Sequence, residues 1–209
     1  MNGLEILKIN KNRKKFIYLI SPNKINKNFY KDLQNIFKNN IVSFFQLRLK
    51  KYSLEKKRII GQKVKKICKK YNVKFIVNDN PYLAKQINAD GCHLGQKDMD
   101  IKQAKTVLKN KIIGITCHNS KKLIVKAYKN KADYVAIGAF YKSQTKKIKY
   151  LAKPSLIKWA SNKIKCPIVV IGGISSKNYK KLLLHKADFL AISGYIWNKN
   201  PSKKIKEFL

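Results

Sequence analysis

Eight short apolar segments alternate along this chain with longer, lysine-rich segments whose apolar residues recur at helical spacing. Each segment is rich in Val, Ile and aromatic residues and is bounded by Gly, Pro, Asn or Asp. This pattern is typical of strands buried on both faces, as in a parallel sheet. The predicted strands cover residues 16–20, 42–47, 74–77, 91–94, 112–116, 134–138, 168–171 and 189–193.

The segments between these strands predict helices, among them residues 54–71, 101–108, 120–130, 154–164 and 176–185. Eight strands, each followed by a helix or a helical turn, predict an α/β fold, the closed parallel (β/α)₈ TIM barrel. We expect residues 1–209 to form a single domain, since this length suffices for one well-buried core. An open doubly wound sheet is the alternative, but no G-x-G-x-x-G motif follows the first strand.

An Ala-Asp pair recurs at the start of the fourth, sixth and eighth predicted strands. The pairs are Ala89-Asp90, Ala132-Asp133 and Ala187-Asp188. Carboxylates at the amino ends of barrel strands lie on the face that serves stability, away from the catalytic face. We therefore expect Asp90, Asp133 and Asp188 to be structural.

The formal net charge of +38 is extreme and is compatible with a polyanionic partner such as nucleic acid. The lysines are spread over every predicted helix, however, and no nucleic-acid-binding motif is recognisable. A coding bias toward Lys, Asn and Ile explains them better, so we expect no specific nucleic-acid partner. No apolar run approaches a membrane span. The four cysteines form no C-x-x-C pair, which favours reduced thiols in a cytoplasmic protein.

Polar residues cluster where the predicted strands end, which is the catalytic face of this fold. Because strand side chains alternate, Gln46, Arg48 and Lys50 share one face while Leu47 and Leu49 face the helices. Three polar side chains that point into a barrel are costly to bury without a ligand. An inward salt-bridge layer is the alternative, but acidic residues are scarce here. We expect a phosphate-bearing ligand.

Two carboxylates follow the third and fourth predicted strands. Asn78-Asp79 ends the third strand, and Asp98 lies just past the fourth. Carboxylates at neighbouring strand ends, facing cationic side chains, suit a Mg²⁺ ion that bridges protein and diphosphate. An ion pair with lysine is the alternative. We prefer Asp98 to Asp100 as a metal ligand, since Asp100 can cap the following helix.

The later strand ends carry hydroxyls and glycines. Thr116 offers a hydroxyl to a phosphate oxygen, whereas His118 fits either a proton carrier or a loop histidine. The sixth strand leads into a loop of hydroxyl and lysine residues, 138–147. Gly172-Gly173 ends the seventh strand and Ser193-Gly194 ends the eighth, where glycines let backbone N–H groups approach an anion.

These motifs resemble those of the thiamine-phosphate synthase/TenI family, in family order, from the first strand to about Gly194. The resemblance rests on Gln46-x-Arg48-x-Lys50, Val77-Asn78-Asp79, Ala89-Asp90-Gly91-x-His93-Leu94-Gly95-Gln96-x-Asp98, Ser143-x-Thr145-Lys146 and Ile171-Gly172-Gly173-Ile174. It implies a (β/α)₈ barrel that joins a pyrimidine diphosphate to a thiazole phosphate and releases pyrophosphate with Mg²⁺.

The resemblance also implies roles for individual residues. Mg²⁺ would be held by Asp79 and Asp98. The pyrimidine substrate and its diphosphate would be held by Gln46, Arg48, Lys50, Asn78, Thr116 and Lys146. The thiazole phosphate would be bound by Ser143, Thr145, Gly172, Gly173, Ile192 and Ser193. Catalysis would depend on Arg48, Lys50, Thr116 and Lys146, whose positive charge and hydroxyl would stabilise the departing diphosphate.

The chain departs from the family pattern at several positions. Thr116 stands where Ser is usual, and Ser143 stands where Thr is usual. Asn80 replaces an arginine, and Ala139 and Lys142 replace prolines. Residues 147–150 lack the usual continuation rich in Gly and Ala. The sequence therefore does not predict whether this loop closes over substrate.

Two rival functions also fit the sequence. The first is the TenI-like thiazole tautomerase branch, which would isomerise the thiazole phosphate with a histidine near position 118 and needs no diphosphate clamp. The joint presence of Gln46, Asp79 and Asp98 favours the synthase. The second is a basic nucleic-acid-binding protein. The oligomeric state is open between a monomer and a homo-oligomer.

Overall fold

The computed structural model describes residues 15–142 and 151–209, whose strands form a closed parallel barrel in chain order. The eight strands are β1 (Ile17–Ile20), β2 (Val42–Leu47), β3 (Lys74–Asn78), β4 (Gly91–Leu94), β5 (Ile112–His118), β6 (Tyr134–Gly138), β7 (Ile168–Ile171) and β8 (Phe189–Ile192). β8 pairs with β1 and closes the sheet, with Leu19 opposite Ile192. The predicted (β/α)₈ barrel is confirmed.

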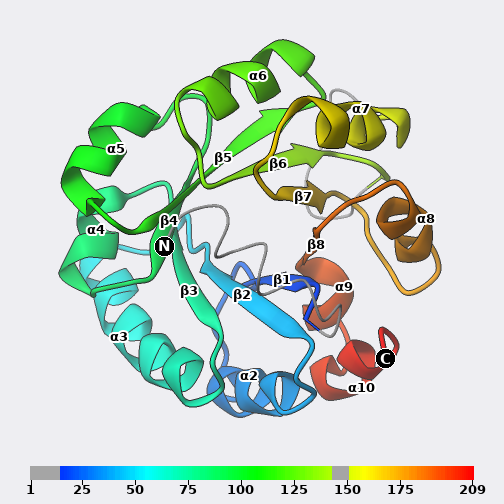
Figure 1. Ribbon diagram of the computed structural model, residues 1–209. Coiled ribbons are helices and arrows are strands. Elements are labelled where there is room, and N and C mark those ends of the chain that lie inside the picture. The colour runs from blue at the N-terminus through cyan, green and yellow to red at the C-terminus, as the bar shows by residue number, and fades with distance from the viewer. Residues whose placement is uncertain (1–14, 143–150) are drawn as a thin grey trace.

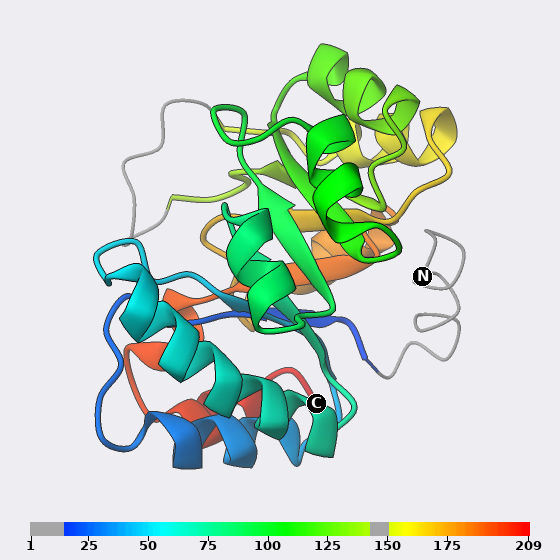
Figure 2. The ribbon, with the colours of Figure 1, turned by 90° about the vertical axis from the view of Figure 1, so that its left-hand side faces the viewer.

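Helices form a ring outside the strands, and the strands cross the middle of the molecule (Figures 1 and 2). They are α2 (Phe29–Phe37), α3 (Leu54–Lys70), α4 (Pro81–Gln86), α5 (Ile101–Leu108), α6 (Lys121–Lys129), α7 (Ser155–Lys163), α8 (Tyr179–Leu184), α9 (Gly194–Trp197) and α10 (Pro201–Lys206). The last helix, α10, packs beside α2 and completes the ring (Figure 1). Within the described ranges, none of these helices is long and apolar enough to cross a membrane.

Side-chain caps fix where several of these helices begin. Ser53, Asn80, Asp100, Ser120 and Asn200 each accept a hydrogen bond from the backbone N–H three residues later. Such caps satisfy one of the donors that a helix leaves unpaired at its amino end. Asp100 is therefore the cap of α5, as predicted, and its carboxylate oxygen lies 3.0 Å from the Gln103 nitrogen.

The strands separate two apolar cores. The larger core lies between the strands and the helices, and contains alternate strand residues such as Leu19, Leu47 and Val77. The smaller core fills the barrel itself. Its members are Tyr18, Ile20, Phe44, Ile76, Ile112, Tyr134, Ala136, Val169, Phe189 and Ala191. A barrel filled in this way has no pore, so a ligand must bind at one of its ends.

The recurrent Ala-Asp pairs lie at the amino ends of β4, β6 and β8. In each case the Asp carboxylate accepts a hydrogen bond from a backbone N–H in the first two residues of the preceding strand. The distances are 2.8 Å for Asp90 with Phe75, 2.8 Å for Asp133 with Ile113 and 2.8 Å for Asp188 with Ile168. These carboxylates join neighbouring strands at the end of the barrel opposite the polar strand ends, as expected of structural residues.

Candidate active site

The carboxyl end of β2 points polar side chains into the barrel mouth. Gln46 is buried, and Leu47 and Leu49 pack in the outer core, so the predicted alternation is present. The next inward residue, Arg48, is partly buried, and its backbone N–H donates a 2.9 Å hydrogen bond to the Ser21 hydroxyl. Its guanidinium is close enough to contribute to the lowered pKa of His93 on β4.

Asp79 follows β3 and faces Lys50 of the β2 loop. Its carboxylate lies 3.5 Å from the Lys50 ammonium, and its backbone N–H donates a 2.8 Å hydrogen bond to the His93 carbonyl. Its φ of 66° lies in the left-handed region that non-glycine residues seldom adopt. Burial raises the pKa of the Asp79 carboxyl, and the neighbouring Asp98 raises it further. The two carboxylates therefore lie close enough to repel each other.

Asp98 is held in place by the loop that follows β4. One of its carboxylate oxygens accepts a 2.6 Å hydrogen bond from the Gly95 backbone N–H. A Cβ atom at position 95 would lie 2.9 Å from this oxygen, so an added side chain would shift the carboxylate from its present position. The sequence motif Gly95-x-x-Asp98 thus presents the carboxylate beside Asp79 at the barrel mouth.

This pair of carboxylates fits a hard divalent cation. Mg²⁺ is commonly bound by one or two carboxylates, with phosphate oxygens and waters as its other ligands. Within residues 15–142 and 151–209, no group of three or more His, Cys, Asp or Glu side chains could hold a metal by itself. Asp79 and Asp98 are consequently suited to a cation that arrives with a phosphorylated ligand.

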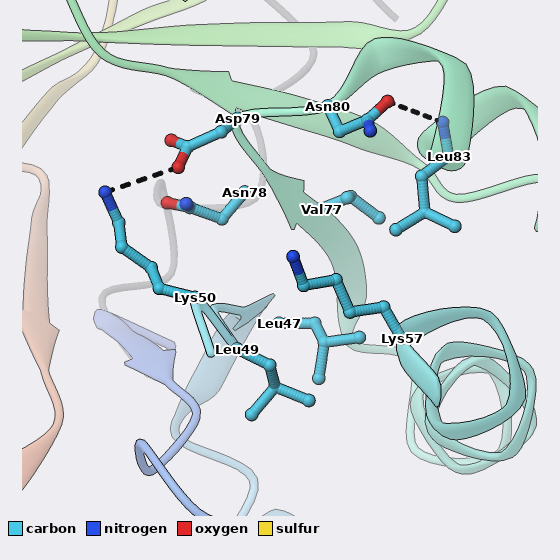
Figure 3. Close-up of a pocket in the computed structure, with 9 residues that line it drawn as sticks. All are labelled: Leu47, Leu49, Lys50, Lys57, Val77, Asn78, Asp79, Asn80 and Leu83. Atoms are coloured by element: carbon cyan, nitrogen blue, oxygen red, sulfur yellow. Dashed lines mark hydrogen bonds and ion pairs between the residues drawn. The ribbon is translucent and has the colours of Figure 1, made fainter. Parts of the chain in front are cut away.

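A cavity of about 200 Å³ lies immediately outside the strand ends, between β2, β3 and the helices α3 and α4 (Figure 3). Asn78 lies beside the Lys50–Asp79 ion pair, and Lys57 of α3 extends its ammonium group toward the same space (Figure 3). The floor of the cavity is apolar and consists of Leu47, Leu49, Val77 and Leu83. The cavity adjoins the barrel mouth and shares Lys50, Asn78 and Asp79 with it.

Thr116 on β5 is bound to its neighbours through both side chain and backbone. Its hydroxyl lies 2.8 Å from Nε2 of His93, and its carbonyl accepts a 2.5 Å hydrogen bond from the Gln96 amide. His118, two residues further, is exposed and has a φ of 50°. The structure thus brings Thr116 to the barrel mouth and leaves His118 at its rim.

A buried chain of polar groups extends from Thr116 across the interior of the barrel. Nδ1 of His93 lies 2.9 Å from the Tyr134 hydroxyl, which lies 2.7 Å from the Tyr18 hydroxyl. The Gln46 amide donates a 3.0 Å hydrogen bond to that same Tyr18 oxygen. The predicted site residues Gln46 and Thr116, on β2 and β5, are therefore connected through His93, which belongs to the quoted family motif, and through two tyrosines that sequence reasoning did not single out.

The glycines after β7 shape the opposite side of the mouth. Gly172 and Gly173 have φ values of 105° and 62°, and a Cβ atom on Gly172 would collide with Ala139. The Phe140 and Tyr141 backbone N–H groups donate to the carbonyls of Ile171 and Gly172 at 3.2 and 3.0 Å. The start of the loop after β6 is thus fixed against the glycines. Ala152 binds the Ala139 carbonyl at 2.7 Å where that loop returns.

The remaining predicted residues fall into two groups. Ser143, Thr145 and Lys146 lie outside the described residues. The side chain of Ile192 points into the outer core, so only its backbone can face a ligand in the mouth. This orientation follows from the alternation of side chains along β8. The Ser193 hydroxyl donates a 3.1 Å hydrogen bond to the Ser21 carbonyl.

Sequence reasoning missed Tyr18, Tyr134 and Ser21. Both tyrosines occupy inward positions of strands that otherwise read as apolar runs, and a buried tyrosine hydroxyl usually requires a partner. The need of these two buried hydroxyls for hydrogen-bond partners is the sequence signal that could have identified the tyrosines. The partners themselves depend on the barrel register, which places β1 and β6 across the interior from each other and is not visible in any single strand.

The fold and the site together define a (β/α)₈ barrel whose mouth combines cationic side chains, paired carboxylates and glycine loops, a combination suited to phosphorylated ligands. The family model described as "Thiamine monophosphate synthase" matches residues 17–196. The chain belongs to this family, which confirms the resemblance seen in its motifs.

Individual relatives agree with this assignment. A thiamine-phosphate synthase of Pelagibacter ubique is 58% identical over 201 residues, which cover 96% of this chain and 97% of that protein. A thiamine-phosphate synthase of Erythrobacter litoralis is 37% identical and covers 92% of both chains. Among solved structures, a thiamine phosphate pyrophosphorylase from Pyrococcus furiosus superimposes with a TM-score of 0.83 at 25% identity, over 94% of each chain.

Proposed function

We propose that this protein is a Mg²⁺-dependent thiamine-phosphate synthase of the cytoplasm. It would join a pyrimidine diphosphate to a thiazole phosphate and release pyrophosphate. The observation that carries the proposal is the pair of carboxylates, Asp79 and Asp98, at adjacent strand ends, with Asp79 3.5 Å from the Lys50 ammonium. A clamp of this kind serves a diphosphate leaving group, and a simple isomerisation would have no use for it.

In the proposed reaction the bond between the pyrimidine methylene carbon and the diphosphate oxygen breaks, and the electron pair leaves with pyrophosphate. The thiazole nitrogen then supplies the electron pair of the new C–N bond and becomes positively charged. No proton has to be removed for this step, so no general base is required. This is consistent with the exposed position of His118.

The chain's own cations would stabilise the departing diphosphate. Arg48, Lys50 and Lys146 would supply positive charge, and the Thr116 hydroxyl would donate to a phosphate oxygen. Mg²⁺, held by Asp79 and Asp98, would neutralise further charge on the diphosphate. Gln46 and Asn78 would bind the pyrimidine.

The thiazole phosphate would lie on the opposite side of the mouth. Its phosphate would be held by Ser143 and Thr145, by the glycines Gly172 and Gly173, and by the backbone at Ile192 and Ser193. The positive φ values of the two glycines are unfavourable for residues with a side chain, and successive backbone N–H groups in such a turn can bind an anion. With both substrates held in line, proximity would contribute much of the rate enhancement.

A product assay tests the proposal directly. The purified protein is incubated with both substrates and Mg²⁺, and thiamine phosphate and pyrophosphate are quantified. We expect both products in equal amounts, and none when either substrate or Mg²⁺ is omitted. Isomerisation of the thiazole phosphate without thiamine phosphate would overturn the proposal in favour of the tautomerase.

A matched pair of lysine variants localises the activity. Lys50→Ala removes the cation that faces Asp79, and Lys51→Ala removes an equal charge from an exposed neighbour. We expect Lys50→Ala to reduce kcat by about 100-fold, the usual effect of losing one group that stabilises developing charge. Lys51→Ala should retain activity. Equal losses in both variants would contradict a specific diphosphate clamp.

A further inference from the structure

The barrel interior contains one continuous path of side-chain hydrogen bonds, from Gln46 on β2 through Tyr18, Tyr134 and His93 to Thr116 on β5. Its four contacts measure 3.0, 2.7, 2.9 and 2.8 Å in that order. Tyr18 and Tyr134 are each about 1% exposed, so their hydroxyls lie below the site and out of reach of a ligand in the mouth.

We propose that Tyr18, Tyr134 and His93 are positioning residues, which form a relay with a single hydrogen-bond direction from Gln46 to Thr116. The relay would fix which of these two groups donates to the substrate and which accepts. This inference rests on the proposed function and adds to it three residues that do not touch the substrate.

The proposed direction begins at Gln46, whose amide nitrogen donates to the Tyr18 oxygen. Tyr18 and Tyr134 each have one further side-chain partner in the relay, so a relay that leaves no hydroxyl hydrogen without an acceptor directs the hydrogen of Tyr18 to Tyr134 and that of Tyr134 to Nδ1 of His93. His93 would then carry its hydrogen on Nε2 and donate it to the Thr116 oxygen.

The geometry of the His93 ring fits this direction. The ring is buried and stacked on the Tyr134 ring, with centroids 5.6 Å apart, and its two nitrogens face the Tyr134 and Thr116 hydroxyls. A neutral ring with one hydrogen donates at one nitrogen and accepts at the other.

The functional consequence concerns the two ends of the relay. Thr116 accepts from His93, so its own hydroxyl hydrogen is left to point into the mouth, where it can donate to a phosphate oxygen. The Gln46 amide is oriented by Tyr18, so its carbonyl oxygen is left to accept from a ligand. A substrate that offers a donor near Gln46 and an anionic oxygen near Thr116 matches this pattern.

A kinetic experiment separates this role from simple packing. Tyr134→Phe removes one hydroxyl from the middle of the relay and preserves the ring beneath Gly114. We expect kcat/KM for the pyrimidine diphosphate to fall about tenfold, roughly the value of one buried hydrogen bond. In a Thr116→Val background, where the relay has lost its end, Tyr134→Phe should change kcat/KM less than about twofold.

The matched control is Tyr179→Phe. It removes the same hydroxyl from a tyrosine of the outer core, whose ring lies against Phe16 and Phe208. This variant should leave kcat/KM unchanged even where its melting temperature falls. Equal effects of Tyr134→Phe in the wild-type and Thr116→Val backgrounds would overturn the relay.

A spectroscopic measurement tests the direction without relying on activity. Nitrogen-15 NMR of the histidine rings, with the His93 signal assigned through a His93→Gln variant, should show the neutral tautomer with hydrogen on Nε2. Hydrogen on Nδ1 would overturn the inference. If the wild-type protein made no thiamine phosphate, the proposed function would fail, while this NMR result would still decide the relay.

Discussion

The Asp133 carboxylate accepts a 2.8 Å hydrogen bond from the Ile113 backbone N–H, while the Asp133 backbone N–H donates to the Ile113 carbonyl, also at 2.8 Å. This two-way connection ties β6 to β5 at the amino end of the barrel. The same connection links Asp90 with Phe75 and Asp188 with Ile168. The repeated acidic residue therefore marks a strand-joining device, distinct from the carboxylates of the mouth.

Asp133→Ala should lower stability and spare the chemistry. It leaves a buried N–H without a partner, so we expect the free energy of unfolding to fall by about 1–3 kcal/mol, measured by urea denaturation. Specific activity per folded molecule should remain close to that of the wild type. A large loss of activity with unchanged stability would contradict the structural role.

Asp98→Ala should have the opposite effect, with activity reduced by at least about 100-fold and little change in melting temperature. Its control is Asp100→Ala, two residues away, which removes only the cap of α5. The control should cost about 1 kcal/mol of stability and keep its activity. Similar kinetic losses in the two variants would argue against a metal ligand at position 98.

Gly172→Ala should weaken binding of the thiazole phosphate more than binding of the pyrimidine diphosphate. An added Cβ would collide with Ala139, and the φ of 105° is unfavourable for alanine. We expect KM for the thiazole phosphate to rise at least about tenfold. Gly61→Ala in helix α3 is the control, because the one short contact of its Cβ, at 2.7 Å, is with the flexible end of the Ile87 side chain.

The buried His93 predicts a pH dependence of stability. Its folded pKa is about 4, below its ordinary value of 6.5, so the unfolded chain binds more protons between these values. The stability that His93 contributes is therefore complete above pH 6.5 and is lost as the pH falls toward 4. The total is roughly 3 kcal/mol. Denaturation of wild type and His93→Gln at several pH values measures the difference.

The control for this experiment is His185→Gln, since His185 is a partly buried histidine at the end of α8, outside the barrel interior. Removing it should not reproduce the effect of His93→Gln. A wild-type curve parallel to that of His93→Gln between pH 4 and 6.5 would show that His93 does not titrate as described.

The sequence was sufficient for much of the fold, because each strand is a compact apolar run with clear boundaries. The predicted strand 91–94 coincides with β4, and 112–116 falls two residues short of β5 at His118. The β5 extension was not predicted because polar residues end its apolar pattern. Gln46, Lys50, Asp79, Asp98 and Thr116 could be placed at the mouth because strand ends of a parallel barrel converge.

The other features of the site could not be predicted, because they depend on contacts between strands that lie far apart in the sequence. The contact of Tyr18 with Tyr134 joins residues 116 positions apart and exists only once β1 and β6 face each other. The outward side chain of Ile192 likewise follows from the register of β8 with β1, in which Ile192 pairs with Leu19. Local periodicity indicates that strand faces alternate, but the closed sheet decides which face is inside.

A crystal structure of the protein with Mg²⁺ and the pyrimidine diphosphate tests the central claim most directly. We expect the diphosphate at the barrel mouth, in contact with Arg48 and Lys50, with Mg²⁺ bound between it and the carboxylates of Asp79 and Asp98. A diphosphate bound elsewhere, or a metal that contacts neither carboxylate, would contradict the account.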